Sequence, residues 1–214
     1  TKSRNCRWSR RWKPGNRLLN SVRMFLKGLI MRNLLLLACL ALAACAQTPM
    51  NFNEDVTLKP WQTSEALQSV RFPANSRGGD LEFCVAKNVI NPAVTFADSA
   101  DSFFGAFTGT YYHDTDTTTV GGGSVIQHSS EKGVIAVGVT SYELSALVKR
   151  YVRFQLTATN DQYEFDKLEQ VQANSGAVPN NGFHPVGAFS GANPKKALES
   201  LEEIAKNIDY CRNL

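Results

Sequence analysis

No hydrophobic run in this chain is long enough to cross a bilayer. The longest has eleven residues, at positions 34–44, whereas a membrane-spanning helix needs about 20. The chain also has no Gly-x-Ser-x-Gly, His-Glu-x-x-His or Gly-x-x-x-x-Gly-Lys-Ser/Thr motif. These patterns go with serine hydrolases, zinc proteases and phosphate-binding loops. The absences argue against a membrane-spanning segment and against those enzyme classes.

Acidic residues are missing from the first 44 positions, which carry ten Lys and Arg. Without those ten, 13 basic residues face 19 acidic ones from position 45 to 214, so the net charge is near −6 instead of +4. The basic charge of the whole chain therefore belongs to its start. It is no argument for nucleic-acid binding, and we expect no nucleic-acid partner.

Residues 34–44 follow Lys27 and Arg32 and run directly into a cysteine. A positive start, a short apolar stretch and small residues at its exit are typical of a secretory signal peptide. The last four residues, Leu42-Ala43-Ala44-Cys45, resemble the lipobox of bacterial lipoproteins. The resemblance implies that Cys45 becomes the first mature residue and is acylated on its sulfur and its amine. No aspartate follows Cys45, which by the same analogy implies sorting to the outer membrane, facing the periplasm.

This interpretation divides the chain into three parts. Residues 1–44 form a leader, in which Met24 starts the signal peptide and the earlier residues are upstream sequence. Residues 45–62 are polar and lack periodicity, so we predict a lipidated, flexible tether. Residues 63–214 have the length of one ordinary domain.

The chain has five cysteines. Cys6 and Cys39 lie in the predicted leader, and Cys45 carries the predicted lipid. Cys84 and Cys211 remain, and two thiols in an oxidising compartment usually pair. A bridge would add about 3–5 kcal/mol on the chain-entropy estimate. However, a strand over 81–90 turns Cys84 away from its core face. The sequence therefore leaves a disulfide and two free thiols both open.

Alternating apolar residues predict four consecutive strands, at 124–130, 134–143, 150–159 and 162–172. Their short connections favour an antiparallel meander. Before them we predict one or two helical turns over 64–70, a strand over 81–90, a helix over 98–112 and a loop over 114–123.

A loop rich in Gly and Pro covers 173–193. Asn193 and Pro194 then begin a helix, as N-cap and first helical residue. Its apolar stripe consists of Leu198, Leu201, Ala205, Ile208 and Cys211. The predicted fold class is α+β, with a mostly meander antiparallel sheet in the order β-α-β-β-β-β-α and a long C-terminal helix packed across one face.

The run Tyr-Val-Arg-Phe-Gln-Leu-Thr-Ala-Thr-Asn-Asp-Gln-Tyr-Glu-Phe at 151–165 is similar to lipoprotein domains of unknown function with a TBP-like or helix-grip fold. By element order, residues 80–211 also resemble the repeated domains of the C subunit of the outer-membrane barrel-assembly machinery. The resemblance implies a last helix held against a curved sheet. It brings no catalytic motif, and the loop at 173–193 departs from the compact versions.

Six aromatic or imidazole side chains are candidate ligand or partner contacts: Phe103, Phe107, Tyr111, Phe183, His184 and Phe189. The first three are spaced by four, which predicts one helical face. That face either packs into the core or lines a pocket between helix and sheet for an acyl chain or a peptide. The last three lie in the loop at 173–193, where they anchor a partner or fold back over a sheet edge.

The three histidines, His113, His128 and His184, lie on different predicted segments. His113 precedes Asp114 and Asp116, residue types that bind metals, but a solvated loop is the plainer interpretation. We expect no metal, no cofactor and no catalytic pair.

Two hypotheses follow. The first is a non-catalytic interaction or accessory module of the bacterial cell envelope, held to the membrane by the lipid on Cys45 and contacting an envelope protein. The alternative is a carrier of a small hydrophobic ligand or lipid, with a pocket between the helices and the sheet. On neither hypothesis is the protein an enzyme.

Overall fold

The computed structural model describes residues 50–76 and 78–214. The predicted signal peptide and Cys45 lie outside the described residues. In chain order the elements are β1 (Val56–Trp61), β2 (Ser64–Pro73), α2 (Leu81–Asn88), β3 (Ala93–Asp98), β4 (Phe103–Phe104), β5 (Tyr111–Tyr112), β6 (Asp116–Gly121), β7 (Ile126–Ser130), β8 (Gly133–Ser145), β9 (Val148–Ala158), β10 (Gln162–Gln172), β11 (His184–Pro185), a short 3-10 turn (Ser190–Ala192) and α3 (Pro194–Arg212).

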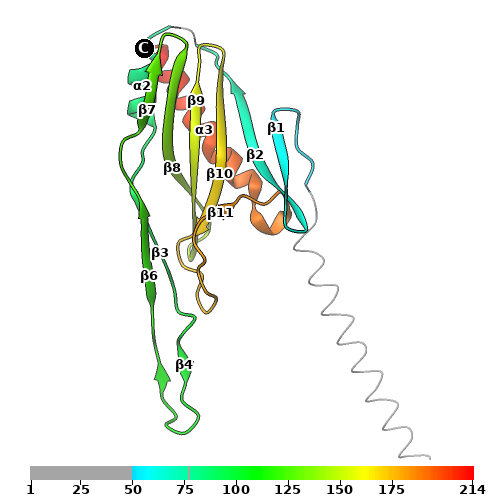
Figure 1. The fold of residues 1–214 in the computed structure, drawn as a ribbon, viewed down its shortest axis with the longest axis vertical. Helices are drawn as coiled ribbons and strands as arrows, with labels where there is room; N and C mark the ends of the chain where they lie inside the picture. Colours follow the sequence, from blue (N-terminus) through cyan, green and yellow to red (C-terminus); the bar gives the residue numbers. More distant parts are fainter. Residues whose placement is uncertain (1–49, 77) are drawn as a thin grey trace, which may run out of the picture. The chain divides into compact units, whose positions relative to one another are not determined.

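The fold is α+β, and its main sheet is antiparallel. The strands lie in the order β1-β2-β10-β9-β8-β7, and β11 pairs with part of β10 (Figure 1). The predicted meander from β7 to β10 is confirmed. In much of β8, β9 and β10 every second residue is buried, which is the alternation that predicted these strands. On β9, for example, Val152, Phe154 and Leu156 are at most 4 % exposed, and the residues between them face the other side of the sheet.

Helix α3 packs on one face of this sheet. Its inward stripe, Ala197, Leu201, Ala205 and Ile208, is at most 4 % exposed and joins the core formed by β2, β8, β9 and β10. The predicted start of the helix at Pro194 is confirmed. The prediction that the Asn193 side chain caps the helix is wrong. Asn193 has a left-handed backbone (φ 56°) and its side chain makes no capping bond. Asn tolerates this conformation, which turns the chain from the 3-10 turn into α3.

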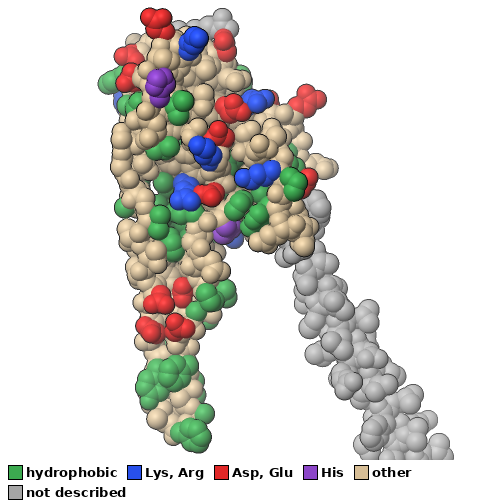
Figure 2. Space-filling model, in the orientation of Figure 1, with side chains coloured by type: hydrophobic (Ala, Val, Ile, Leu, Met, Phe, Trp, Pro, Cys, Tyr) green, Lys and Arg blue, Asp and Glu red, His purple; other side chains and the backbone are tan. Residues whose placement is uncertain are grey.

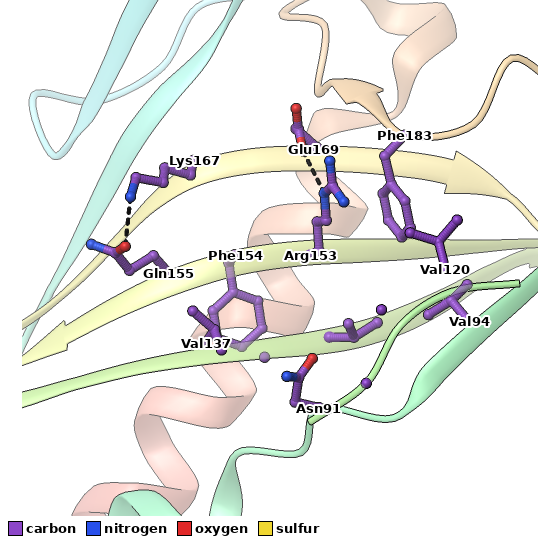
Figure 3. A pocket seen from close by; sticks show the side chains of 14 residues that line it. Asn91, Val94, Val120, Val137, Arg153, Phe154, Gln155, Lys167, Glu169 and Phe183 are labelled. Atoms are coloured by element: carbon purple, nitrogen blue, oxygen red, sulfur yellow. Dashed lines mark hydrogen bonds and ion pairs between the residues drawn. The ribbon is translucent and has the colours of Figure 1, made fainter. Parts of the chain in front are cut away.

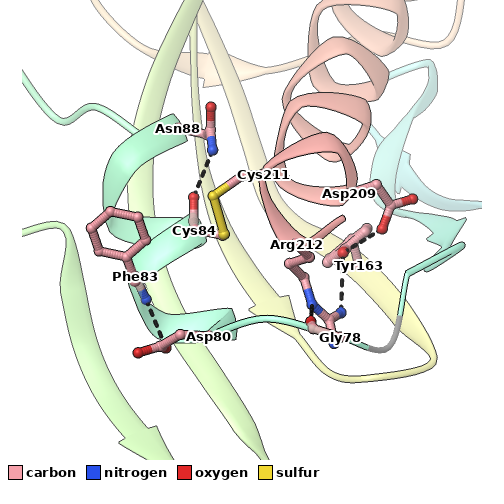
Figure 4. Close-up of a disulfide and its surroundings, with 9 residues drawn as sticks. All are labelled: Gly78, Asp80, Phe83, Cys84, Asn88, Tyr163, Asp209, Cys211 and Arg212. Carbon is pink, nitrogen blue, oxygen red and sulfur yellow. Dashed lines mark hydrogen bonds between the residues drawn. A yellow bond between two sulfur atoms is a disulfide. The ribbon is translucent and has the colours of Figure 1, made fainter. Parts of the chain in front are cut away.

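The strand predicted over 81–90 is wrong, because this segment contains helix α2. The Asp80 side chain accepts a hydrogen bond from the backbone N–H of Phe83 at 3.0 Å and caps the helix. As a result Cys84 faces inward, 2 % exposed, while Phe83 is 60 % exposed. Cys84 and Cys211 form a disulfide between α2 and α3, with their Cα atoms 5.6 Å apart (Figure 4). The question that the sequence left open is thus settled in favour of the bridge.

A cluster of buried polar side chains lies beside the disulfide. The Tyr163 hydroxyl donates to Oδ1 of Asp209 at 2.6 Å, and Arg212 donates to the carbonyl of Gly78 at 3.0 Å (Figure 4). Burial, together with the Asp209 hydrogen bond, raises the pKa of Tyr163 to about 12. Burial alone would raise the pKa of Asp209, but hydrogen bonds from Tyr163, Asn75 and Ser76 outweigh it and lower that pKa. These bonds fasten the end of α3 to the sheet.

The first hairpin corrects two predictions. Residues 56–61, within the expected tether of 45–62, form edge strand β1, and the predicted helical turns over 64–70 are strand β2. The two strands pair from Val56 opposite Val70 to Trp61 opposite Ser64. Both predictions were made from short local patterns. Which side of β2 is buried depends on its pairing with the rest of the sheet, and a local pattern does not show that pairing.

Residues 93–123, called the arm below, also differ from prediction. β3 and β6 pair from Ala93 opposite Gly121 to Asp98 opposite Asp116, so most of the loop expected over 114–123 is a strand. The helix predicted over 98–112 is absent, since β4 and β5 form a second small hairpin there. Gly105 and Gly109 weaken a helix at this point and suit a turn. These extra strands also make the predicted order β-α-β-β-β-β-α incomplete.

The loop predicted over 173–193 is mostly irregular, as expected, but part of it joins the sheet. The backbone N–H of Leu67 donates to the carbonyl of Val186 at 2.8 Å, and that of Ala188 donates to the carbonyl of Glu65 at 2.8 Å. Residues 184–188 therefore lie between β2 and β10. They fill the gap opened by an irregularity in β10 between Asp166 and Glu169.

Candidate functional site

The end of the arm exposes an unusual number of apolar rings. Of the eleven large apolar side chains that the described residues expose, five lie within residues 103–112: Phe103, Phe104, Phe107, Tyr111 and Tyr112. Phe107 is fully exposed, and the other four are 44–65 % exposed. Figure 2 shows apolar side chains gathered at the free end of the arm. We call residues 103–112 the aromatic tip. Clusters of exposed apolar side chains are a common feature of contact surfaces in proteins.

The aromatic tip is held by its own hydrogen bonds. The ring of Phe103 stacks on that of Tyr112 at a centroid distance of 4.9 Å. The backbone N–H of Gly105 donates to the carbonyl of Thr110 at 2.8 Å, and that of Gly109 donates to the carbonyl of Gly105 at 2.8 Å. The backbone turn that carries the rings is therefore held in one arrangement, which lowers the entropy lost on binding.

Carboxylates surround the junction between the stem of the arm and its tip. Asp98, Asp101, Asp114 and Asp116 lie there, and the sequence has no Lys or Arg between Lys87 and Lys132. Acidic side chains lie next to the apolar end in Figure 2. Hydrogen bonds from the backbone N–H groups of Asn180 and Ala100 hold the pKa of Asp98 below its usual value. We call these four residues the acidic collar.

At the other end of the arm, where it meets the sheet, is an open hollow of about 380 Å³. Its apolar lining comes from the sheet, with Val137 and Val139, from the arm, with Val94 and Val120, and from Phe183 in the long loop (Figure 3). The hollow lies on the face of the sheet opposite the inward-facing side chains. Lining residues Val137, Arg153 and Gln155 lie on this face. They alternate along the strands with the buried residues Ala136, Phe154 and Leu156. We call this the basal hollow.

The polar lining of the basal hollow includes two cations, Arg153 and Lys167, and one carboxylate, Glu169. Arg153 forms an ion pair with Glu169, and its guanidinium lies 4.5 Å from the ring centre of Phe183. Lys167 donates to Oε1 of Gln155 at 2.7 Å (Figure 3). Lys167 has a left-handed backbone (φ 50°) within the irregularity of β10. Such bulges redirect side chains, and here the bulge turns a lysine toward the hollow.

The six predicted contact residues lie in separate places. Phe103, Phe107 and Tyr111 are on the aromatic tip, not on a helix, and they line no pocket between helix and sheet, so both interpretations of that predicted face are wrong. Phe183 lines the basal hollow, whereas His184 stacks on Trp61 at 5.8 Å. Phe189 precedes the 3-10 turn.

The predicted set of contact residues left out Phe104, Tyr112, Arg153 and Lys167. The first two are the cross-strand neighbours of Tyr111 and Phe103, and a hairpin interpretation of 103–112 would have found them. Arg153 and Lys167 gave no signal of their own, because the fold brings them to the hollow.

Within residues 50–76 and 78–214, no group of three or more His, Cys, Asp or Glu is arranged to hold a metal ion. His113 comes within 3.5 Å of the hydroxyl of Thr115 in the exposed part of the arm. The thiols of Cys84 and Cys211 are joined. None of the helices described has both the length and the hydropathy of a membrane span.

Comparison of the chain with protein-family models, with curated proteins and with solved structures gives no match. The features of the described residues that bear on function are the aromatic tip, the acidic collar and the basal hollow.

Proposed function

We propose that this chain is a lipid-anchored, non-catalytic interaction module of the bacterial cell envelope, and that its aromatic tip is the surface that contacts a partner protein. The observation that carries the proposal is the exposure of five aromatic rings within residues 103–112. Rings of this kind are the usual anchors of protein interfaces, where truncating one costs about 2 kcal/mol or more.

The position of the rings also supports contact with a partner rather than packing into the core of this chain. The core of the described residues is complete without them, because none of the five belongs to either buried cluster. They are held in place by the turn of the tip itself. A ring on a turn that is held in place, and that the core of the described residues leaves exposed, is suited to bind another surface.

The proposed location rests on the first part of the chain and on the cysteines. Acylation of Cys45 anchors the protein, and more than one acyl chain is needed for stable anchoring. The disulfide between Cys84 and Cys211 suits the oxidising periplasm. We therefore propose an outer-membrane lipoprotein that faces the periplasm, with the membrane and an envelope protein as partners and with no nucleic acid, metal or cofactor.

The helix-grip arrangement is part of the same proposal. Its support is the contact of α3 with one face of the antiparallel sheet through Leu201 and Ile208. The arm and the first hairpin would then be additions to that arrangement.

A carrier of a hydrophobic ligand is the alternative, and the region between helices and sheet gives it little support. Ala197, Leu201 and Ile208 are fully buried there. A hollow of about 360 Å³ does lie beside α3, near β2, but its lining includes Arg71, Lys195 and Glu202. An acyl chain would have to cover these charges. Native mass spectrometry of gently purified protein tests this alternative, which needs a bound hydrophobic molecule.

Photo-crosslinking in cells tests the main proposal. A photoreactive phenylalanine analogue replaces Phe107 in the full chain, and crosslinked products are identified by mass spectrometry. The matched control carries the analogue at Leu147, which is 89 % exposed in the turn between β8 and β9. We expect a discrete protein product from position 107 and none from position 147.

The proposal is wrong about the tip if both positions give the same products or if neither gives any. Its anchor is tested separately with Cys45→Ser. Loss of palmitate labelling and release from the membrane fraction are expected, and unchanged labelling would contradict the lipoprotein assignment.

A further inference from the structure

The aromatic tip and the basal hollow are complementary to each other in polarity and in charge. We propose that the aromatic tip of one copy of this chain docks in the basal hollow of a second copy. This inference rests on the proposed function and specifies one partner of the tip.

The hollow has the size and lining that a ring requires. A cavity of about 150 Å³ already holds benzene, and the basal hollow measures about 380 Å³. Its apolar lining includes Val94, Val137 and Phe183. The Arg153 guanidinium already lies on the ring of Phe183, and such a cation also attracts a second aromatic ring. Phe107, which is fully exposed at the end of the tip, is the ring best placed to enter.

The charges of the two surfaces are opposite. The acidic collar contributes four carboxylates next to the tip, and the arm has no Lys or Arg to balance them. The lining of the hollow has two cations, Arg153 and Lys167, and one carboxylate, Glu169. A docked tip would bring the collar toward the two cations. The same collar opposes insertion into an anionic lipid surface, because like charges repel there.

The contact must join two molecules. Val120, which lines the hollow, lies nine positions after Tyr111 on the tip. At about 3.3 Å per residue this stretch extends about 30 Å. Strand pairs β3–β6 and β4–β5 hold the two ends of this stretch, and Ser102 is hydrogen-bonded to the backbone of Asp114 between them, so the tip cannot turn back into its own hollow. Figure 1 shows the two ends of the arm at opposite ends of the β3–β6 ribbon.

Tip and hollow are different surfaces, so the contact is heterologous and runs head to tail. A docked pair still offers one free tip, on one copy, and one free hollow, on the other. Association therefore continues beyond a dimer unless the chain of copies closes into a ring.

The test uses residues 46–214, which form one compact unit with its own core and disulfide. Sedimentation velocity is recorded up to about 1 mM, where even weak association is populated. Two variants are compared with the wild type: a tip variant, F103A/F107A, and a hollow variant, V137D, which places a carboxylate opposite the collar. A surface control, F83A, changes an exposed ring on α2 (60 % exposed).

We expect the wild type and F83A to form species larger than dimers, more weakly as salt rises. Each variant alone should associate at least tenfold more weakly. Mixed in equal amounts, the two variants should form dimers and nothing larger, because only the intact tip of V137D and the intact hollow of F103A/F107A remain. K167E, an exposed change that leaves the core untouched, should also weaken association and so replaces V137D if that variant fails to fold.

A monomeric wild type over the whole range overturns the inference, as does association that F103A/F107A leaves unchanged. Tip-dependent binding to vesicles of phosphatidylethanolamine and phosphatidylglycerol, without self-association, also overturns it in favour of a lipid surface. A monomeric wild type whose position 107 still crosslinks to another protein in cells would refute only this inference and leave the proposed function standing.

Discussion

Removal of the disulfide should destabilise this protein by several kcal/mol. Cys84 and Cys211 are 127 residues apart, so reduction frees a loop of that length in the unfolded chain. The chain-entropy relation gives about 5 kcal/mol for such a loop. Domains of this size are stable by about 5–15 kcal/mol, so this one bridge contributes a large part of the total. It also holds α2, whose eight residues are too few for a stable isolated helix.

The experiment compares the free energy of unfolding in urea for residues 46–214 with that of C84A/C211A, in which alanine avoids leaving a buried hydroxyl. We expect a loss of about 3–5 kcal/mol, and the reduced wild type should match the variant. A loss below about 1 kcal/mol would refute the reasoning. Two titratable thiols on unreduced protein from the periplasm would refute the bridge itself.

Two further predictions concern the core. Leu201→Ala should cost about 2.7–5 kcal/mol in urea denaturation, because Leu201 is fully buried between α3 and the sheet; the matched change Leu147→Ala, at an exposed turn, should cost less than about 0.5 kcal/mol. Equal costs would mean that α3 does not pack as described. Tyr163 has a pKa raised to about 12, so the folded state holds its proton more tightly than the unfolded state. Its contribution is complete below pH 10 and declines as pH rises from 10 to about 12, and the free energy of unfolding should fall less steeply over that range in Tyr163→Phe. Identical slopes would contradict the buried hydroxyl.

The parts of the fold that were predicted from the sequence are those whose burial follows a simple period. β9 alternates Val152, Phe154 and Leu156 inward, and α3 repeats Ala197, Leu201 and Ala205 on one face. Each such segment packs a single side against the core, so its own residues carry the signal.

Other segments take their structure from distant partners. α2 has an alternating pattern of apolar residues, yet the Asp80 cap and the disulfide to α3 make it a helix facing inward. β1 contains Pro60 and looked like a tether, but an edge strand tolerates proline and its pairing with β2 is set by the rest of the sheet.

The candidate site was predicted in part. Phe103, Phe107 and Tyr111 were selected as contact residues, but their spacing by four suggested a helix. In the hairpin they are exposed, so no burial period exists to reveal the strands. The basal hollow could not be predicted from the sequence. A bulge in β10 places Lys167 at the hollow, and the order of the strands in the sheet places Arg153 there.

Cysteine labelling at the aromatic tip in living cells tests the central claim most directly. Phe107→Cys and Leu147→Cys are introduced into the full chain, and each is labelled with a small maleimide in cells and in the purified protein at low concentration. We predict that position 107 is labelled readily in the purified protein and is protected in cells, while position 147 reacts equally in both. Equal labelling of position 107 in the two settings would mean that nothing covers the tip and would contradict the account.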